Sequence, residues 1–485
     1  MLSKQRQPFH GIYEVRHWKC HDEPNQPALL RRTKSGYLKL NYERLMQRMA
    51  TAREHPALSM HSMKRSQNPR RRFVINTTLS ALLIGAGDRA RAATRTPQAG
   101  SFSHELAMKD AFIVTPLIFG AKGDGISDDT AALNAMYAHV RGTSQRTVFL
   151  RGRTYLVKGS IYARDVTTIG EGATLTSRVD SAKASCAFEW GGSDTFVTEL
   201  VFDLSNVGKD AMQGVLNAVN DASNQRFFRN RVFSRTTEPS KLQSNIFGSW
   251  FLGTGLNGLY VQDNVFEKCS YGVQINNQDG MERRVREKPL GRPSRHLHIS
   301  GNSCLDASIG VNTPHIMCSD VVIEGNTIAP SNLQLDLPLN VAHVTDLVIR
   351  ANTVASNSAS ANGTLHVEDA SGAIAITGNV VTALRANNGI QFGVDPSVSH
   401  DAQPVTRAII ADNHVQGSVT RGETTGILLP DPGTTDTIIT GNYVSGFAQG
   451  INAVAESSVS GNTITNCPTP LRLTKRSATG QNIVK

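Results

Sequence analysis

The chain has 485 residues, of which 39% are hydrophobic, 19% are charged and only 6 are cysteine, with a formal net charge of +10. This composition excludes a wholly disordered chain and a disulfide-built scaffold, and it predicts a soluble globular or solenoid protein. The positive charge lies in residues 1–92, which contain 18 Lys and Arg and 6 Asp and Glu. The other 393 residues contain 32 Lys and Arg and 34 Asp and Glu and are therefore close to neutral. We therefore expect no nucleic-acid partner, because binding a phosphate backbone needs clustered cations.

Residues 63–92 have the layout of a signal peptide. Arg70, Arg71 and Arg72 precede an uncharged stretch at 73–86, and a small-residue cleavage site follows at 90–92. The arginines and the residues after them resemble a twin-arginine export signal. The stretch is too short to span a membrane, and the alternative is an ordinary buried helix.

On this reading residues 1–62 are a misassigned extension or a disordered pre-region, and residues 93–117 are a linker. Cleavage near Ala92 would release a periplasmic or extracellular protein that meets the membrane only during export.

Residues 118–133 predict a strand, a glycine turn and the start of a helix. Ser127 or Asp128 is the expected N-cap, and Asp129 would add favourable charge in the first turn. A helix reaching to about Val140 would cover the open end of a stack of strands and protect its edge.

An asparagine motif recurs through the second half of the chain. Each copy has alternating apolar residues, a small or polar turn residue, Asn, and a branched or aromatic residue two positions later. The spacing varies from 20 to 38 residues, and an earlier copy places Arg231 in the asparagine position. The asparagines are Asn264, Asn302, Asn326, Asn352, Asn379, Asn413, Asn442 and Asn462.

A glycine followed by apolar residues repeats in step with the asparagines, for example at Gly272, Gly389, Gly426 and Gly450. Each unit therefore holds at least two short strands, without the period of a helical repeat. Units of this size bury their apolar face only by stacking. The sequence predicts an all-β protein, a single-stranded right-handed parallel β-helix of about ten or more coils with a short N-terminal capping helix, in which the asparagines bond from coil to coil.

The five cysteines after the leader are expected to be small buried residues. Their number is odd and their spacing matches no metal motif, which argues against a full disulfide framework and against a zinc site. They are Cys186, Cys269, Cys304, Cys318 and Cys467.

The stretch 119–133, FGAKGDGISDDTAAL, resembles the opening motif of the pectate-lyase superfamily of β-helix proteins, which includes rhamnogalacturonases and epimerase-like pectate lyase domains. The following strand at 148–156 is similar as well. The resemblance covers residues 118–177 closely, and the asparagine units extend it to about Leu473, leaving 474–485 as a tail. It implies a β-helix domain at 118–473 and an activity on polysaccharides by hydrolysis, elimination or epimerisation.

The catalytic motifs of the individual families are missing. The paired aspartates, Gly-His-Gly and Arg-Ile-Lys of polygalacturonases are not found, and the only adjacent aspartates, Asp128 and Asp129, belong to the helix cap. Candidate site residues must therefore be inferred from their position in the repeat.

Counting from each repeat glycine reveals a row of polar residues just past the second strand. Equal offsets would place them on one face of the stack, at separations that suit a pair of catalytic carboxylates, although turn acids exposed to solvent are the alternative. Trp250 is expected at the comparable place in its own unit. The row contains Asp221, Asp279, His315, Glu368 with Asp369, Asp395, Asp431 and Glu456, and His343 can join it.

The long loops at 236–255 and 278–295 flank the units with Asp221 and Asp279, and long loops are usually functional. We predict Asp221 and Asp279 as an acid/base pair, with His315 as a supporting or alternative base. The substrate-binding candidates are Trp250, Arg283, Arg284, Arg286 and Asn312, because aromatic rings and guanidinium groups suit an acidic polysaccharide. No metal and no cofactor are expected. The alternative is a non-catalytic β-helix that binds glycan or serves as an envelope structural protein.

Overall fold

The structure is a computed structural model. It describes residues 114–144, 147–178, 186–206, 213–235, 246–276, 292–312, 318–331, 337–358, 363–385, 387–394, 405–420 and 422–485. The predicted extension, signal peptide and most of the linker lie outside these residues. Within them, no helix has the length and apolar character needed to cross a membrane.

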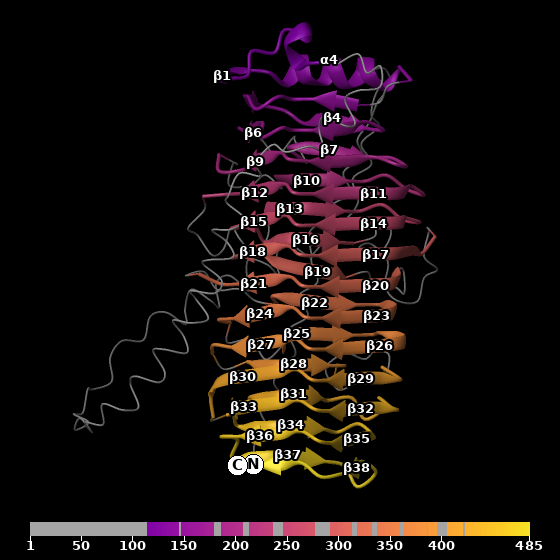
Figure 1. The fold of residues 1–485 in the computed structure, drawn as a ribbon, viewed down its shortest axis with the longest axis vertical. Helices are drawn as coiled ribbons and strands as arrows, with labels where there is room; N and C mark the ends of the chain where they lie inside the picture. The colour runs from indigo at the N-terminus through magenta and orange to yellow at the C-terminus, as the bar shows by residue number, and fades with distance from the viewer. Residues whose placement is uncertain are drawn as a thin grey trace, which may run out of the picture. The chain divides into compact units, whose positions relative to one another are not determined.

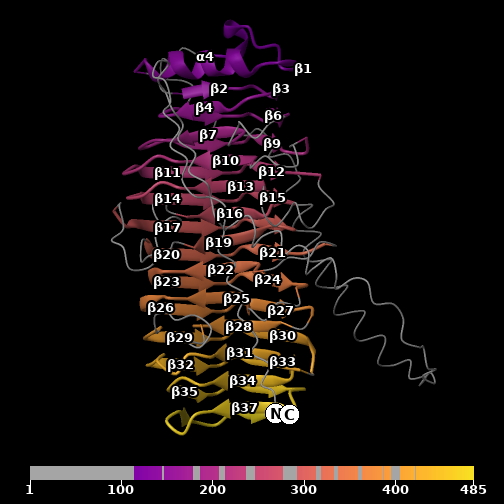
Figure 2. The same ribbon diagram turned by 180° about the vertical axis from the view of Figure 1, so that it is seen from behind.

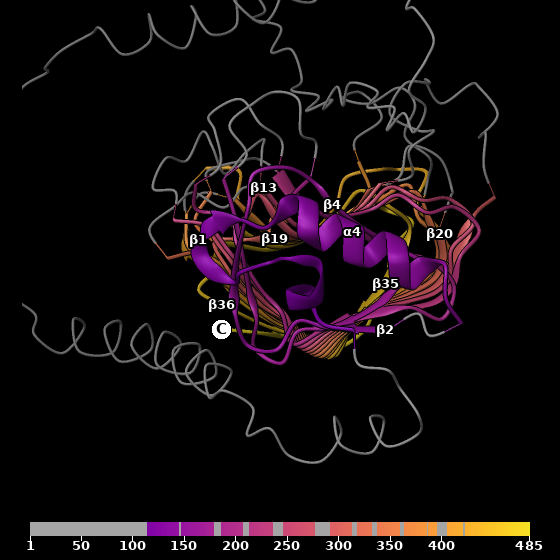
Figure 3. The ribbon, with the colours of Figure 1, turned by 90° about the horizontal axis from the view of Figure 1, so that it is seen from above.

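The described chain winds into a right-handed parallel β-helix with three parallel sheets, as the repeats predicted. Strands from successive coils lie one beneath the next (Figures 1 and 2). Seen along the axis, the sheets form three sides of the coil, with β4, β13 and β19 on one side, β20 and β35 on a second, and β1 and β36 on a third (Figure 3). In this order we name them sheets C, B and A.

Sheet A consists of β1 (Asp124–Asp128), β3 (Thr154–Val157), β6 (Thr174–Ser177), β9 (Val201–Asp203), β12 (Arg231–Phe233), β15 (Val265–Glu267), β18 (Ser303–Leu305), β21 (Thr327–Ala329), β24 (Thr353–Ser356), β27 (Val380–Ala383), β30 (His414–Val419), β33 (Tyr443–Phe447), β36 (Thr463–Thr465) and β39 (Ile483–Val484). Sheet B consists of β2 (Thr147–Phe149), β5 (Thr167–Ile169), β8 (Phe196–Thr198), β11 (Ser223–Phe228), β14 (Asn257–Gln262), β17 (Ser294–Ser300), β20 (Cys318–Glu324), β23 (Val344–Arg350), β26 (Ser371–Thr377), β29 (Ala408–Ala411), β32 (Thr437–Thr440), β35 (Ser457–Ser460) and β38 (Ala478–Thr479).

Sheet C consists of β4 (Ile161–Arg164), β7 (Phe188–Gly191), β10 (Gln213–Asn217), β13 (Ile246–Phe251), β16 (Tyr271–Ile275), β19 (Ser308–Asn312), β22 (Leu339–Ala342), β25 (Gly363–Glu368), β28 (Asn388–Phe392), β31 (Thr425–Leu429), β34 (Gln449–Ala453) and β37 (Thr469–Leu473). The residues after 473, which we expected to be a tail, contribute β38 and β39 to one more coil.

One end of the coil is covered by the 3-10 helix η1 (Pro116–Phe119) and the helix α4 (Thr130–Arg141). Helix α4 lies across the end of the stack (Figure 3) and buries Leu133, Met136, Tyr137 and Val140 against it. Each such side chain contributes roughly 1.5–3 kcal/mol of hydrophobic free energy. The structure therefore confirms the predicted capping helix, which we expected to reach about Val140 and which ends at Arg141.

The start of α4 differs from the prediction in detail. The N-cap residue is Asp129, and Ser127 and Asp128 belong to β1. The Asp129 carboxylate accepts hydrogen bonds from the backbone N–H groups of Lys122 and Gly123, at 2.7 and 3.0 Å, and so fixes the preceding loop. Asp128 accepts from the N–H of Thr130 at 3.0 Å, which satisfies one of the free donors of the first turn.

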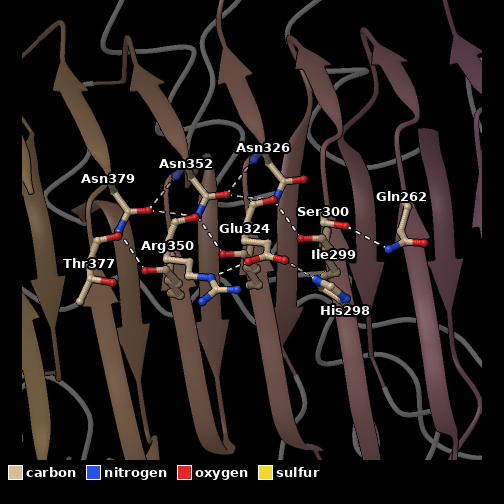
Figure 4. Close-up of polar contacts among 12 residues, drawn as sticks. Gln262, His298, Ile299, Ser300, Glu324, Asn326, Arg350, Asn352, Thr377 and Asn379 are labelled. Atoms are coloured by element: carbon tan, nitrogen blue, oxygen red, sulfur yellow. Dashed lines mark hydrogen bonds and ion pairs between the residues drawn. The ribbon is translucent and has the colours of Figure 1, made fainter.

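The asparagines form a continuous ladder between sheets B and A (Figure 4). Asn326 Nδ2 donates to Asn352 Oδ1 at 3.0 Å and to the Ile299 carbonyl at 2.9 Å, while Asn326 Oδ1 accepts from the N–H and the amide of Asn302. The same bonds recur from coil to coil, so each buried amide is satisfied. The ladder continues beyond the eight predicted residues to Asn482.

At its other end the ladder includes Asn230, whose amide donates to Asn264 Oδ1 at 3.3 Å. Placing Arg231 in the asparagine position was wrong by one residue, since Arg231 pairs with Val265 in sheet A. The residue before each ladder asparagine from Asn230 to Asn462 has a left-handed backbone, for example Arg229 with φ 54° and Gly301 with φ 65°. This conformation turns the chain from sheet B into sheet A.

The repeat glycines leave room for side chains that cross the coil from sheet A. A Cβ on Gly426 would lie 2.2 Å from Val444 Cγ1, and one on Gly450 would lie 2.6 Å from Ile464 Cγ2. Both distances are far below a van der Waals contact, so only glycine fits these positions. The second repeat motif therefore marks close packing across the core.

Candidate functional site

The outer face of sheet C differs from that of sheet B because most of its side chains from β7 to β28 are buried. Residues at alternate positions, such as Val273, Val341 and Val367, face the core, so the residues between them face outward. Cα register joins these outward residues into one column: Glu189, Leu216, Trp250, Gln274, Gly310, Asn340, His366, Gln391, Leu428, Asn452 and Arg472.

The column is both polar and shielded. Gln274, Asn340, His366, Gln391 and Asn452 are each at most 8% exposed. On sheet B, by contrast, the outward Ile409 and Ile438 are 44% and 43% exposed. Burying a polar group costs free energy unless it is paired, so a shielded polar column needs partners from outside the strands that carry it.

Several polar atoms of the column have no hydrogen-bond partner among the described residues. These are Gln274 Oε1, Asn340 Oδ1, both ring nitrogens of His366, and Asn452 Oδ1. In folded proteins the large majority of buried polar side-chain atoms are satisfied. Unsatisfied atoms concentrated on one face are what a binding site for a polar ligand presents before the ligand arrives.

His366 is the most distinctive residue of this face. Burial lowers the pKa of its imidazole below the ordinary value, and the carboxylates of Glu368 and Asp369 oppose that shift only in part. The ring is thus held neutral, with one nitrogen able to accept a proton or a hydrogen bond. Its Nε2 lies 3.9 Å from Glu368 Oε2, within reach of a shared ligand but beyond a direct hydrogen bond.

A second histidine and carboxylate lie where the chain leaves sheet C. His343 Nε2 is 3.1 Å from Asp369 Oδ2, and both residues have left-handed backbones, with φ 57° and 49°. The register of β22 with β25 places His343 beside Asp369. Two members of the predicted row, His343 and the Glu368–Asp369 pair, are therefore neighbours. We call Asn340, His343, His366, Glu368 and Asp369 the His366 cluster.

Trp250 does not occupy the place expected for it. It lies within β13 on the outer face, between Leu216 and Gln274, and not in the turn beside Asp221. Its ring stacks on Phe247 at 4.4 Å between centroids, and Phe247 stacks on Tyr271 at 6.2 Å. Together they form a small aromatic cluster on the outer face, separate from the core.

Asp221 lies in the turn from sheet C to sheet B, four residues after β10. Its side chain is 58% exposed, and Oδ1 is 3.8 Å from Nε of Arg292, which is 84% exposed. This separation makes a loose ion pair, worth at most about 1 kcal/mol in water. Both groups therefore remain open to solvent and to a ligand.

The other predicted site residues lie outside the described residues or on their edge. Asp279, His315, Asp395, Arg283, Arg284 and Arg286 all fall in the segments that are not described. Asn312 ends β19, where its backbone pairs with Ala342. Of the remaining row, Asp431 is buried and its carboxylate accepts from the N–H of Gly433 at 2.8 Å, while Glu456 is exposed.

Sequence reasoning missed Gln274, Asn340, His366 and Gln391. A signal was present, because a polar residue stands two positions after the glycine in Gly272-Val273-Gln274 and in Gly389-Ile390-Gln391. A polar residue at the same outward position in successive units is the pattern that distinguishes the buried polar face of sheet C from a face exposed to solvent. The row counted from the glycines emphasised turn residues instead.

Comparison with known proteins finds one family whose model matches part of the chain. Residues 117–286 match the family described as rhamnogalacturonase A/epimerase, pectate lyase-like. No curated protein matches the chain.

Several solved structures resemble the chain. The A-module of the mannuronan C-5 epimerase AlgE6 of Azotobacter vinelandii is 15% identical, with a TM-score of 0.46, and the match covers 76% of this chain and 99% of that one. The catalytic unit of an α-1,3-glucanase of Streptomyces thermodiastaticus is 13% identical, with a TM-score of 0.42, covering 78% and 68%. The surface adhesin PfbA of Streptococcus pneumoniae is 12% identical, with a TM-score of 0.34, covering 77% and 100%.

Proposed function

We propose that the protein is an exported enzyme, a glycoside hydrolase or lyase, that acts on a polysaccharide bound along the outer face of sheet C. The observation that carries this proposal is the column of buried polar side chains from Gln274 to Gln391. Several of their polar atoms have no hydrogen-bond partner among the described residues. Sugars offer such partners in their hydroxyl groups. The match of residues 117–286 to a rhamnogalacturonase and epimerase family supports the same class of activity.

The substrate proposed is an acidic polysaccharide. Arg292 extends into solvent beside Asp221 and is available to bind a carboxylate. Arg283, Arg284 and Arg286 belong to the same loop by sequence and would add guanidinium groups. Trp250, from β13 on the outer face of sheet C, and Asn312, at the end of β19, would contribute ring and amide contacts.

The reaction proposed uses Asp221 and Asp279 as the acid/base pair. In hydrolysis, one carboxylic acid protonates the glycosidic oxygen and the other, as carboxylate, activates water or attacks the sugar. In elimination, His315 would take the α-proton while an arginine stabilises the enolate beside the sugar carboxylate. The glycosidic C–O bond at the β-carbon then breaks as the double bond forms, and the leaving oxygen takes a proton from the carboxylic acid of the pair. Export would follow the signal at 63–92, and N-terminal sequencing of the secreted protein tests it by finding a start near residue 93.

The test of function is turnover on a panel of acidic and neutral polysaccharides, followed by reducing-sugar release and by the absorbance of unsaturated uronate products. We expect turnover, and a loss of about 100-fold or more in Asp221→Asn and Asp279→Asn. Glu456→Gln is the matched control, because it removes an exposed carboxylate from the same predicted row in a distant unit. Absence of turnover on every substrate would refute the enzyme and leave a glycan-binding protein.

A further inference from the structure

The middle of sheet C contains a polar segment with clear limits. Asn340, His366 and Gln391 are successive outward residues on β22, β25 and β28. Gly310 precedes them without a side chain, and Leu428 follows them with an apolar one. The polar segment therefore spans three neighbouring strands, about 10 Å from first to last.

The charge around this segment is negative. Glu368 lies 3.9 Å from His366, and Asp369 lies beside it. Among the described residues, no Lys or Arg stands on sheet C from β7 through β34. A sugar carboxylate placed here would meet two carboxylates and no cation, which disfavours it. The situation differs at Arg292, which lies between β16 and β17, three strand spacings or about 14 Å along the stack from the strand of His366.

The hydrogen-bonding groups, in contrast, suit hydroxyls. Asn340 Oδ1 and the ring nitrogens of His366 have no hydrogen-bond partner among the described residues. Gln391 makes only long bonds, 3.4 Å from Asn388 Nδ2 and 3.5 Å to the Gly393 carbonyl. A sugar hydroxyl is both donor and acceptor, so it can satisfy either side of an amide or a neutral imidazole.

We propose that Asn340, His366 and Gln391 form a subsite for an uncharged sugar residue, which they bind through its hydroxyl groups, with Glu368 accepting a further hydroxyl. The inference rests on the proposed binding of polysaccharide along sheet C, and it refines the substrate. The preferred polysaccharide contains neutral sugars as well as acidic ones, and the neutral sugar sits at β22, β25 and β28.

The test measures binding of the full chain to two sets of immobilised oligosaccharides, neutral hexose and deoxyhexose oligomers and oligouronates. We expect neutral oligomers to bind, and their affinity to fall about tenfold in His366→Phe and in Asn340→Leu. Gln262→Leu is the matched control, an outward amide on sheet B and therefore off the proposed binding face, and it should bind within about twofold of the unaltered chain. Circular dichroism and urea midpoints check that each variant folds.

A gain of function complements these losses. Gln391→Lys places a cation in the segment and should raise the affinity for oligouronates relative to neutral oligomers. The proposal is overturned if only oligouronates bind the unaltered chain, if no oligosaccharide binds, or if His366→Phe and Asn340→Leu bind as the control does. Because binding is measured without turnover, a chain that binds neutral oligomers through His366 yet cleaves nothing would refute the proposed reaction and retain the subsite.

Discussion

Replacing Asn326 by Leu tests whether the asparagine ladder holds the coils together. Asn326 is 1% exposed and bonds to neighbours on both sides. The change removes its amide donors to Ile299 O and Asn352 Oδ1, and it leaves the backbone N–H of Asn302 without its acceptor. An orphaned buried donor costs about 1–3 kcal/mol and each lost bond about 1 kcal/mol. After allowing for the burial of the leucine side chain, we expect the free energy of unfolding to fall by about 3 kcal/mol.

The assay is urea unfolding of the full chain followed by circular dichroism, where this loss would lower the midpoint by about 1 M. Asn482→Leu is the matched control, because Asn482 ends the ladder and is partly exposed, so water can replace its bonds. It should cost under about 1 kcal/mol. Equal losses at the two positions, or a loss below 1 kcal/mol at Asn326, would show that the ladder does not carry this stability.

Three further predictions concern single positions. Gly426→Ala should destabilise the chain by about 1–3 kcal/mol because the new Cβ meets Val444, whereas Gly142→Ala, where the nearest atom is 3.5 Å away, should change it by under about 1 kcal/mol. Ala351→Gly should raise the free energy of unfolding by about 0.5–1 kcal/mol and so raise the urea midpoint, since Ala351 has φ 53°; a lower midpoint would contradict a strained turn. The unaltered chain should lose free energy of unfolding between pH 7.5 and 5.5, because the folded chain resists protonating His366 while the unfolded chain binds the proton below pH 6.5. His366→Phe should make this loss smaller by about 1 kcal/mol. Identical pH profiles would contradict a neutral imidazole.

The fold could be predicted from the sequence because its determinants are local and repeated. Asn302, Asn326 and Asn352 recur with similar residues around them in the sequence. Buried amides that repeat in this way can hydrogen-bond to the asparagines of the coils on either side. The error at Arg231 has a physical cause. The turn is defined by a left-handed residue before the asparagine, and Arg229 has this conformation although its side chain gives no sign of it.

The site was less accessible to sequence reasoning because it depends on register across coils. Asn340 and His366 are 26 positions apart in sequence and paired in space, and while His366 comes three residues after Gly363, no glycine lies in the ten residues before Asn340. Only the alternation within each strand places them on the outer face. Counting from glycines did find Asp369, six residues after Gly363, and His343 was added to the row without a glycine of its own; both lie in the turns that end neighbouring strands.

The most direct test of the account is a crystal structure of the chain with a bound oligosaccharide that contains neutral and acidic sugars. We predict that the sugar chain runs along the outer face of sheet C, with hydroxyl groups on Asn340 and His366 and a carboxylate toward Arg292. An oligosaccharide bound on sheet A or sheet B, with the column from Gln274 to Gln391 untouched, would contradict it.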